Sequence, residues 1–291
     1  MKIPEHLKGG PTWRRIQALI YDVRLIRNIK FWYREEKSKS SHIFVVGPPR
    51  CGTTLAKNVI WCHPKVCSVK YETSFFLREN YIDFRHPEVP NEIMEAIINE
   101  SRNDIDLFDR IASVIKEKKN GRYFLEKTPG HALRLSYIVD HFPKSTFVFV
   151  VRDPRDGLCS AKETPAVWSN YSDKDKQGGY LAVWKRSVQK YFRCKDDTSV
   201  SLLKYEDFCR YPQEIIKEIM RDIGVRWRRK QLSPTSYGNT PDSEPDSHKL
   251  LGQPVTTERI GRWREELSEK EVSRTKEVLG DAMRRLSYPL G

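Results

Sequence analysis

The sequence has no run of about 18 apolar residues, the length that a membrane-spanning helix needs. Near its start it also lacks the compact apolar core of a secretory signal peptide. None of its six cysteines forms a C-x-x-C pair, and their proportion is far below that of small disulfide-stabilised secreted domains. These absences favour free thiols in a reducing compartment, and we expect a cytoplasmic protein.

Acidic residues are in deficit, with 39 Asp or Glu against 52 Lys or Arg and a net charge of +13 at pH 7. A basic balance suits phosphate-rich small molecules, anionic glycans, nucleic acid or an anionic membrane surface. Basic residues without a recognisable nucleic-acid-binding fold are weak evidence for a nucleic-acid partner. We therefore expect no nucleic acid among the partners.

Part of the positive charge is concentrated in residues 1–40, which hold ten Lys or Arg and four Asp or Glu. Apolar residues from Ile16 to Ile29 recur at near-helical spacing between basic ones, which predicts a basic amphipathic helix. Such a helix either packs its apolar stripe on the main domain or contacts an anionic membrane surface, and the sequence leaves both open. We expect the main domain over residues 41–291.

From residue 42 onward, apolar runs alternate with helical stretches, as in βα units around a parallel sheet. The length suits one such domain. We predict an α/β fold of three layers, a P-loop fold with a central parallel β-sheet flanked by helices. The predicted strands are 43–46, 66–69, 123–125, 146–151 and 200–203, and the predicted helices are 53–62, 91–118, 131–141, 155–162, 180–194, 212–223 and 268–286.

A glycine loop follows the first predicted strand and enters the first predicted helix. Residues 42–55 read His-Ile-Phe-Val-Val-Gly-Pro-Pro-Arg-Cys-Gly-Thr-Thr-Leu. Backbone N–H groups in such a loop, and the positive end of the helix, bind phosphate. The Gly-x4-Gly spacing matches the loop of nucleotide triphosphatases, but that motif continues with Lys and then Ser or Thr, where this chain has Thr53 and Thr54.

A cation lies inside the loop instead, at Arg50. The stretch Gly-Pro-Pro-Arg-Cys-Gly-Thr-Thr resembles the 5′-phosphosulfate loop of the sulfotransferase family, enzymes that use 3′-phosphoadenosine 5′-phosphosulfate (PAPS) and release adenosine 3′,5′-bisphosphate (PAP). The resemblance implies that Arg50 takes the place of a catalytic Lys or Arg. It also implies that the 5′-phosphosulfate is held by Arg50, Cys51, Gly52, Thr53 and Thr54.

A second motif follows the strand predicted at 146–151, where Arg152-Asp-Pro-Arg-Asp-Gly-Leu-Cys-Ser160 enters a helix. It resembles the family's 3′-phosphate motif, in which an Arg at the strand end and a Ser eight residues later bind the phosphate that distinguishes this cofactor from ATP. Those positions are Arg152 and Ser160. Arg suits the task because its planar fork donates two parallel hydrogen bonds to phosphate oxygens.

Three further stretches resemble family landmarks. Glu-Lys-Thr-Pro at 126–129 resembles a stretch of Golgi-type carbohydrate sulfotransferases whose lysine lies near cofactor and acceptor, which implies a catalytic role for Lys127. Lys-Tyr-Glu-Asp at 204–207 implies that Tyr205 lies near the adenine. Arg-Ile-Gly-Arg-Trp at 259–263 resembles the closing segment that returns to the 3′-phosphate, which implies roles for Arg259 and Gly261.

The base that removes the acceptor's proton has two candidates. Glu72 follows a predicted strand and resembles the catalytic Glu of Golgi-type members. Cytosolic-type members have a His two residues after the lysine, where this chain has Pro129, and His131 is the fallback. The implied reaction moves a sulfonyl group to an acceptor hydroxyl or amine on a carbohydrate, a lipid or a small molecule, with no metal required.

A P-loop kinase or nucleotide triphosphatase is the alternative function, because it would share the architecture. It would need a lysine at position 53 and ligands for Mg²⁺. Asp153 follows an apolar strand as a metal ligand would, but Arg152 stands beside it and would repel a metal. Residues 232–257, rich in Ser, Pro, Thr and Asp, are predicted as a long irregular loop, either a functional lid or disordered.

Overall fold

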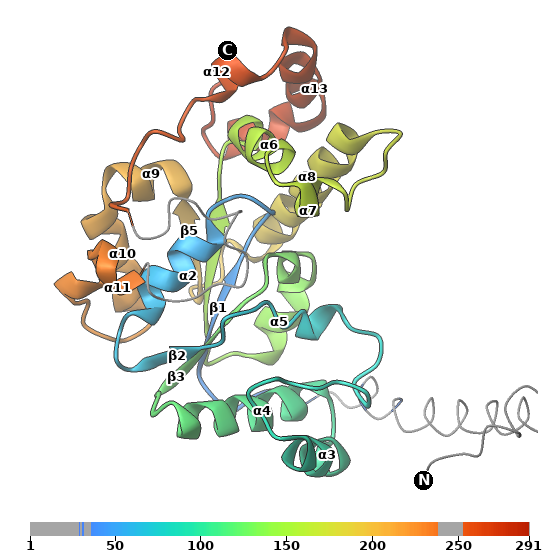
Figure 1. The fold of residues 1–291 in the computed structure, drawn as a ribbon, viewed down its shortest axis with the longest axis vertical. Helices are drawn as coiled ribbons and strands as arrows, with labels where there is room; N and C mark the ends of the chain where they lie inside the picture. The colour runs from blue at the N-terminus through green and yellow to red at the C-terminus, as the bar shows by residue number, and fades with distance from the viewer. Residues whose placement is uncertain (1–28, 30, 32–35, 238–252, 291) are drawn as a thin grey trace, which may run out of the picture.

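The computed structural model describes residues 29, 31, 36–237 and 253–290 (Figure 1). Its sheet consists of five strands that all run parallel, in the order β2-β3-β1-β4-β5. The strands are β1 (His42–Val46), β2 (Val66–Ser68), β3 (Tyr123–Lys127), β4 (Thr146–Val151) and β5 (Val200–Lys204). The predicted class, a parallel sheet flanked by helices, is confirmed, and every predicted strand is present to within two residues at each end.

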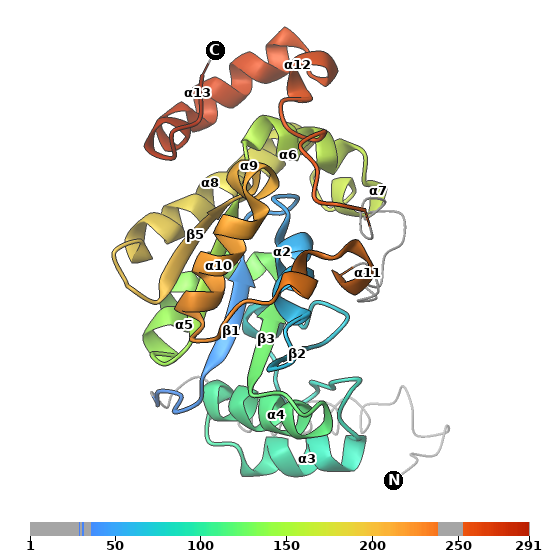
Figure 2. The ribbon, with the colours of Figure 1, turned by 90° about the vertical axis from the view of Figure 1, so that its left-hand side faces the viewer.

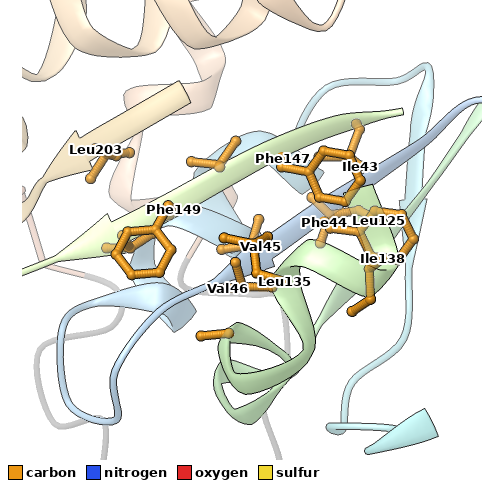
Figure 3. Close-up of a cluster of buried hydrophobic side chains, with 14 of the residues drawn as sticks. Ile43, Phe44, Val45, Val46, Leu125, Leu135, Ile138, Phe147, Phe149 and Leu203 are labelled. Atoms are coloured by element: carbon orange, nitrogen blue, oxygen red, sulfur yellow. The ribbon is translucent and has the colours of Figure 1, made fainter. Parts of the chain in front are cut away.

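The two central strands are buried on both faces, which explains why their sequences are unbroken apolar runs. All five residues of β1 are buried, as are five of the six in β4. Their side chains meet those of the neighbouring strands and of α5 (Leu135–His141) in one core (Figure 3). Phe44 of β1 stacks on Phe147 of β4, with ring centroids 5.1 Å apart.

Helices cover both faces of the sheet (Figures 1 and 2). On one face lie α2 (Thr53–Trp61), α10 (Pro212–Asp222) and α11 (Pro234–Tyr237), and on the other lie α5 and α8 (Lys176–Cys194). The 3-10 helix η3 (Pro129–Arg134) leads directly into α5, so the helix predicted at 131–141 is divided in two.

The two ends of the sheet carry different groups of helices. At the amino ends of the strands lie α3 (Asn91–Glu100) and α4 (Asp104–Lys118) (Figure 2). At the carboxyl ends lie α6 (Pro154–Lys162), α7 (Pro165–Trp168), α12 (Trp263–Glu266) and α13 (Glu269–Arg285). The smaller elements are η2 (Phe75–Leu77), α9 (Tyr205–Arg210) and η4 (Arg229–Leu232).

The prediction of one helix over 91–118 is wrong, because the chain turns between α3 and α4. Asn103 has an extended backbone, and its side chain accepts a hydrogen bond from the Asp106 N–H at 2.7 Å. This is the N-cap geometry that starts a new helix. The sequence Ser-Arg-Asn-Asp contains that cap, but the apolar spacing continues across it.

Most of the basic amphipathic helix predicted within residues 1–40, and residues 238–252 of the predicted long loop, lie outside the described residues. Phe31 is described, and it is buried with its ring centroid 5.5 Å from that of Tyr81. Within the described ranges, no helix combines the length and the apolar character that crossing a bilayer requires.

Candidate active site

A cavity of about 1180 Å³ opens at the carboxyl ends of the strands, where ligands bind in open α/β sheets. It brings together residues from segments that are far apart in the sequence. Among its lining residues are Arg50, Gly52, Thr53, Thr54, Glu72, Lys127, Arg152, Ser160, Tyr205 and Arg259. Of the predicted site residues, Cys51, Gly261 and the fallback base His131 are not in the lining.

The loop between β1 and α2 provides a backbone that fits an anion. Gly52 is the N-cap of α2 and has φ +92°, a conformation that glycine adopts without strain. A Cβ at this position would lie 2.5 Å from Cδ2 of Tyr205. Among the described residues no side chain caps the N-terminus of α2, and its first turn has no acidic residue, so its N–H groups face the cavity with an uncompensated positive end.

Arg50 and Ser160 connect the two predicted phosphate motifs. Arg50 has φ 65° and extends its side chain towards α6, where its Nε donates to the Ser160 Oγ at 3.1 Å. The two residues are 110 positions apart in the sequence. The loop predicted to hold the 5′ end of a nucleotide and the helix predicted to hold its 3′-phosphate therefore form one site.

Arg152 lies at the end of β4 against two other predicted site residues. Its guanidinium carbon is 4.5 Å from the centre of the Tyr205 ring, and its Nη2 donates to the carbonyl oxygen of Arg259. The indole of Trp184 donates to the Arg152 carbonyl at 3.3 Å and holds the backbone there. These contacts fix a planar cation on the wall of the cavity.

The closing segment of the chain is held by an acidic residue that the sequence did not single out. Asp156 on α6 accepts the N–H of Gly261 at 2.7 Å and that of Trp263 at 3.1 Å. The Gly261 N–H is thus directed at Asp156, outside the cavity lining. Burial raises the pKa of Asp156, while these N–H donors oppose the shift.

Arg262 is a lining residue that sequence reasoning missed. Arg262 forms an ion pair with Glu163, and Glu163 also forms one with Arg259 at 3.3 Å. The hydrogen bonds from Arg262 lower the pKa of Glu163, the ion pair contributes to the same shift, and burial opposes it. The sequence could have indicated Arg262, because it lies between Gly261 and Trp263 in the stretch that resembles the family's closing segment.

Glu72 and Lys127 form an ion pair in the lining of the same cavity. The Lys127 Nζ donates to the Glu72 Oε1 at 2.7 Å. The lysine side chain is only 2% exposed, whereas that of Glu72 is 45% exposed, so the carboxylate is the member that reaches open space. The pair places a carboxylate and a cation beside each other in the cavity.

His131 lies away from the cavity, in η3. It is fully buried, and its Nε2 accepts the N–H of Phe76 at 3.1 Å. Burial lowers its pKa to about 3. His131, the fallback base, therefore has a structural role: its ring is neutral, and its Nε2 is occupied by the hydrogen bond from Phe76.

Cys51, a residue of the loop between β1 and α2, is also buried. Burial raises the pKa of its thiol to about 12, with Arg152 opposing the shift. Only its backbone is left to contact a ligand, because its side chain faces the core.

The model of the sulfotransferase family matches residues 42–229. The chain is 23% identical over 268 residues to protein-tyrosine sulfotransferase 1 of Danio rerio, covering 84% of this chain and 72% of the relative. It is 23% identical over 240 residues to the protein-tyrosine sulfotransferase of Drosophila melanogaster, covering 76% of this chain and 46% of that relative.

Solved structures share the fold. The sulfotransferase domain of the Synechococcus PCC 7002 olefin synthase aligns with a TM-score of 0.63 at 17% identity, over 86% of this chain and 98% of that domain. Mouse sulfotransferase SULT7A1, complexed with PAP, aligns with a TM-score of 0.56 at 16% identity, over 86% of each chain.

The parallel sheet, with a glycine loop and a helix N-terminus at its carboxyl edge, defines an α/β protein whose cavity suits an anionic ligand. With the family model spanning well over half of its length, the chain belongs to the sulfotransferase family. The alternative of a kinase or nucleotide triphosphatase receives no support from these matches.

Proposed function

We propose that this protein transfers a sulfonyl group from PAPS to an acceptor hydroxyl and releases PAP. The observation that carries the proposal is the Arg50–Ser160 hydrogen bond, which joins the two phosphate motifs in one cavity. The match to the sulfotransferase family supports it independently.

The described residues fit a nucleotide with an anionic group at each end. The 5′ end would be held by the uncapped N-terminus of α2, with Arg50, Thr53 and Thr54. The 3′-phosphate would be held by Arg152 and Ser160, and the Tyr205 ring beside Arg152 would contact the adenine. When bound, PAPS supplies the sulfonyl group, whose bond to the bridging phosphate oxygen breaks as the acceptor oxygen bonds to sulfur.

Glu72 is the base in this proposal, and its exposure in the cavity supports the role. Its Oε1 is held by Lys127, and we assign its Oε2 to the acceptor's proton. The ammonium of Lys127 fixes the direction of the carboxylate and adds positive charge where the departing oxygen becomes negative. Arg50 supplies charge there too, by hydrogen bonding and not by giving up a proton, because a guanidinium stays protonated.

A tyrosine hydroxyl on a protein is the acceptor that we test first. The named relatives are protein-tyrosine sulfotransferases, although the chain spans as little as 46% of one relative's length. The cavity wall formed by α7, α8 and the segment between them includes aromatic and apolar residues that suit a phenol ring, beside the polar residues Asn170, Ser172 and Arg186. The aromatic and apolar residues there are Ala166, Val167, Tyr171, Ala182 and Val183.

The test is transfer of label from ³⁵S-labelled PAPS to panels of tyrosine peptides, glycans, lipids, small phenols and amines. We expect label in at least one hydroxyl panel with the wild-type protein and a strong reduction with Glu72→Gln. No transfer to any panel, together with no binding of PAP, would overturn the proposal. Transfer to an amine alone would overturn the choice of a hydroxyl acceptor.

We also propose a cytoplasmic protein, with peripheral contact to anionic membranes through residues 1–40. All six cysteines, which lie within the described residues, are free thiols, which supports a reducing compartment. The full chain should sediment with phosphatidylserine vesicles at low salt and be released as salt screens the attraction. Equal sedimentation by a chain that starts at Ser41 would contradict the membrane contact.

A further inference from the structure

Glu126 is a buried carboxylate next to Lys127 that the proposed reaction does not use. It is fully buried in β3, and its Oε1 accepts hydrogen bonds from two threonine hydroxyls. These are the Thr73 Oγ1 at 3.0 Å and the Thr128 Oγ1 at 2.6 Å. Each threonine directly follows one member of the Glu72–Lys127 pair.

The same hydroxyl groups also hold the turn after Glu72. The Ser74 N–H donates to the Thr128 Oγ1 at 3.2 Å, and the Phe75 N–H donates to the Thr73 Oγ1 at 3.1 Å. Ser74 has φ 51°, which is unfavourable for a residue other than glycine, so this turn needs contacts that impose its conformation. One carboxylate oxygen thus ties the turn to the end of β3 through two hydroxyl groups.

We infer that Glu126 is a positioning residue, which sets the orientation of Glu72 and Lys127 through Thr73 and Thr128. A displacement of the base by about 1 Å is enough to slow a reaction by about 100-fold, so a shared anchor for both members matters. The kinetic part of this inference rests on the proposed sulfonyl transfer. The structural part, that the network holds residues 72–75, does not.

The charged and titratable groups around Glu126 fit the role of an anchor. Burial is the largest influence and raises the pKa of Glu126 to about 7, while the two threonine hydroxyls and Lys57 of α2 lower the pKa and Glu72 raises it further. The Nδ1 of His131 in η3 lies 3.6 Å from the Glu126 Oε1. A single buried acceptor with two hydroxyl donors is the kind of polar network that specifies one arrangement.

The test removes one hydroxyl at a time with little change of volume, in Thr73→Val and Thr128→Val. Thr275→Val is the matched control, because Thr275 is equally buried but bonds to the Glu271 carbonyl on α13, away from the cavity. Hydrogen–deuterium exchange of the peptide covering residues 72–76 reports on the turn directly. We expect faster exchange in the two network variants and unchanged exchange in the control.

The kinetic readout compares each variant in two backgrounds. With Glu72 present, Thr73→Val should lower kcat by about 10-fold and leave the KM for PAPS unchanged. In the Glu72→Gln background the further loss should be below about 2-fold, because there is no longer a base to misplace. Glu126→Gln, whose amide oxygen can still accept both hydroxyl groups, should retain more kcat than Glu126→Leu.

Equal losses of kcat in both backgrounds would overturn the positioning role, since they would show that Thr73 acts without Glu72. Unchanged exchange of residues 72–76 in Thr73→Val and Thr128→Val would overturn the network itself. If the wild-type protein transfers no label at all, the proposed function fails, and the exchange measurement still decides whether Glu126 anchors the turn.

Discussion

Gly52 gives the clearest single-residue test of the phosphate loop. Its φ of +92° is unfavourable for any residue with a Cβ, and adopting it costs such a residue roughly 1–2 kcal/mol. The added Cβ in Gly52→Ala would also lie 2.5 Å from Cδ2 of Tyr205, so the ring must move. The backbone cost and the close contact with Tyr205 act together, so we expect Gly52→Ala to lower the free energy of unfolding by about 2–4 kcal/mol.

The same substitution should weaken PAP binding, because the Tyr205 ring that must move also lies 4.5 Å from the Arg152 guanidinium. The assays are thermal unfolding, with an expected fall in Tm of at least about 3 °C for a chain of this size, and titration calorimetry with PAP.

Gly280→Ala is the matched control. Gly280 lies inside α13, and the nearest atoms to an added Cβ are 3.8 and 4.0 Å away, which is ordinary contact. This substitution should raise stability by about 0.5–1 kcal/mol and leave PAP binding unchanged. A Gly52→Ala protein with wild-type Tm and wild-type affinity for PAP would refute our account of the loop.

Three further predictions concern charged side chains. Glu72→Gln should lower kcat by about 10²–10⁴-fold, the usual range for loss of a general base, with PAP affinity nearly unchanged in calorimetry; a normal rate across pH would remove Glu72 as the base. Arg50→Ala should weaken PAPS binding by about 1.5–3 kcal/mol and also lower kcat, whereas Arg50→Lys should recover much of kcat because the charge returns. If kcat of Arg50→Lys is as low as that of Arg50→Ala, a positive charge at this position is not sufficient for the role of Arg50. Burial raises the pKa of Glu126 from 4.5 to about 7, so the folded state holds an extra proton between these values, and the stability that this gives is lost as pH rises towards 7. Relative to Glu126→Gln, the wild-type free energy of unfolding should therefore fall between pH 5 and pH 8 in urea titrations, and a constant difference would contradict the shift.

The convergence of the two phosphate motifs could be predicted from the sequence, because it follows from a general rule. The unbroken apolar runs ending at Val46 and Val151 predict buried parallel strands, and parallel strands place their carboxyl ends on one edge of the sheet. Glycines and arginines directly after such strands lie close together when the two strands are neighbours, as β1 and β4 are. The motif residues therefore share the cavity with little dependence on detailed packing.

Other features depend on contacts between distant segments that have no local signal. Nothing around His131 in the sequence shows that its ring is buried with Nε2 bonded to the Phe76 N–H. The Asp156 carboxylate meets Gly261, 105 residues away, only once α6 and the closing segment are packed together. The Glu72–Lys127 ion pair and its link to Glu126 likewise require the β2–η2 turn to lie against the end of β3.

The most direct test of the central claim is whether the cavity recognises the 3′-phosphate of the nucleotide. Thermal unfolding should be measured with PAP, ADP and ATP at equal concentrations, with and without Mg²⁺, for the wild-type protein and for Ser160→Ala. A ligand at 100 times its Kd stabilises the folded state by about 2.7 kcal/mol, so a preference for PAP appears directly as a larger rise in Tm. We predict that, without Mg²⁺, PAP raises the Tm more than ADP or ATP does. In Ser160→Ala, the rise in Tm with PAP should exceed the rise with ADP or ATP by less than it does in the wild-type protein. Equal stabilisation by ADP, or a requirement for Mg²⁺, would contradict the assignment of this cavity to PAPS.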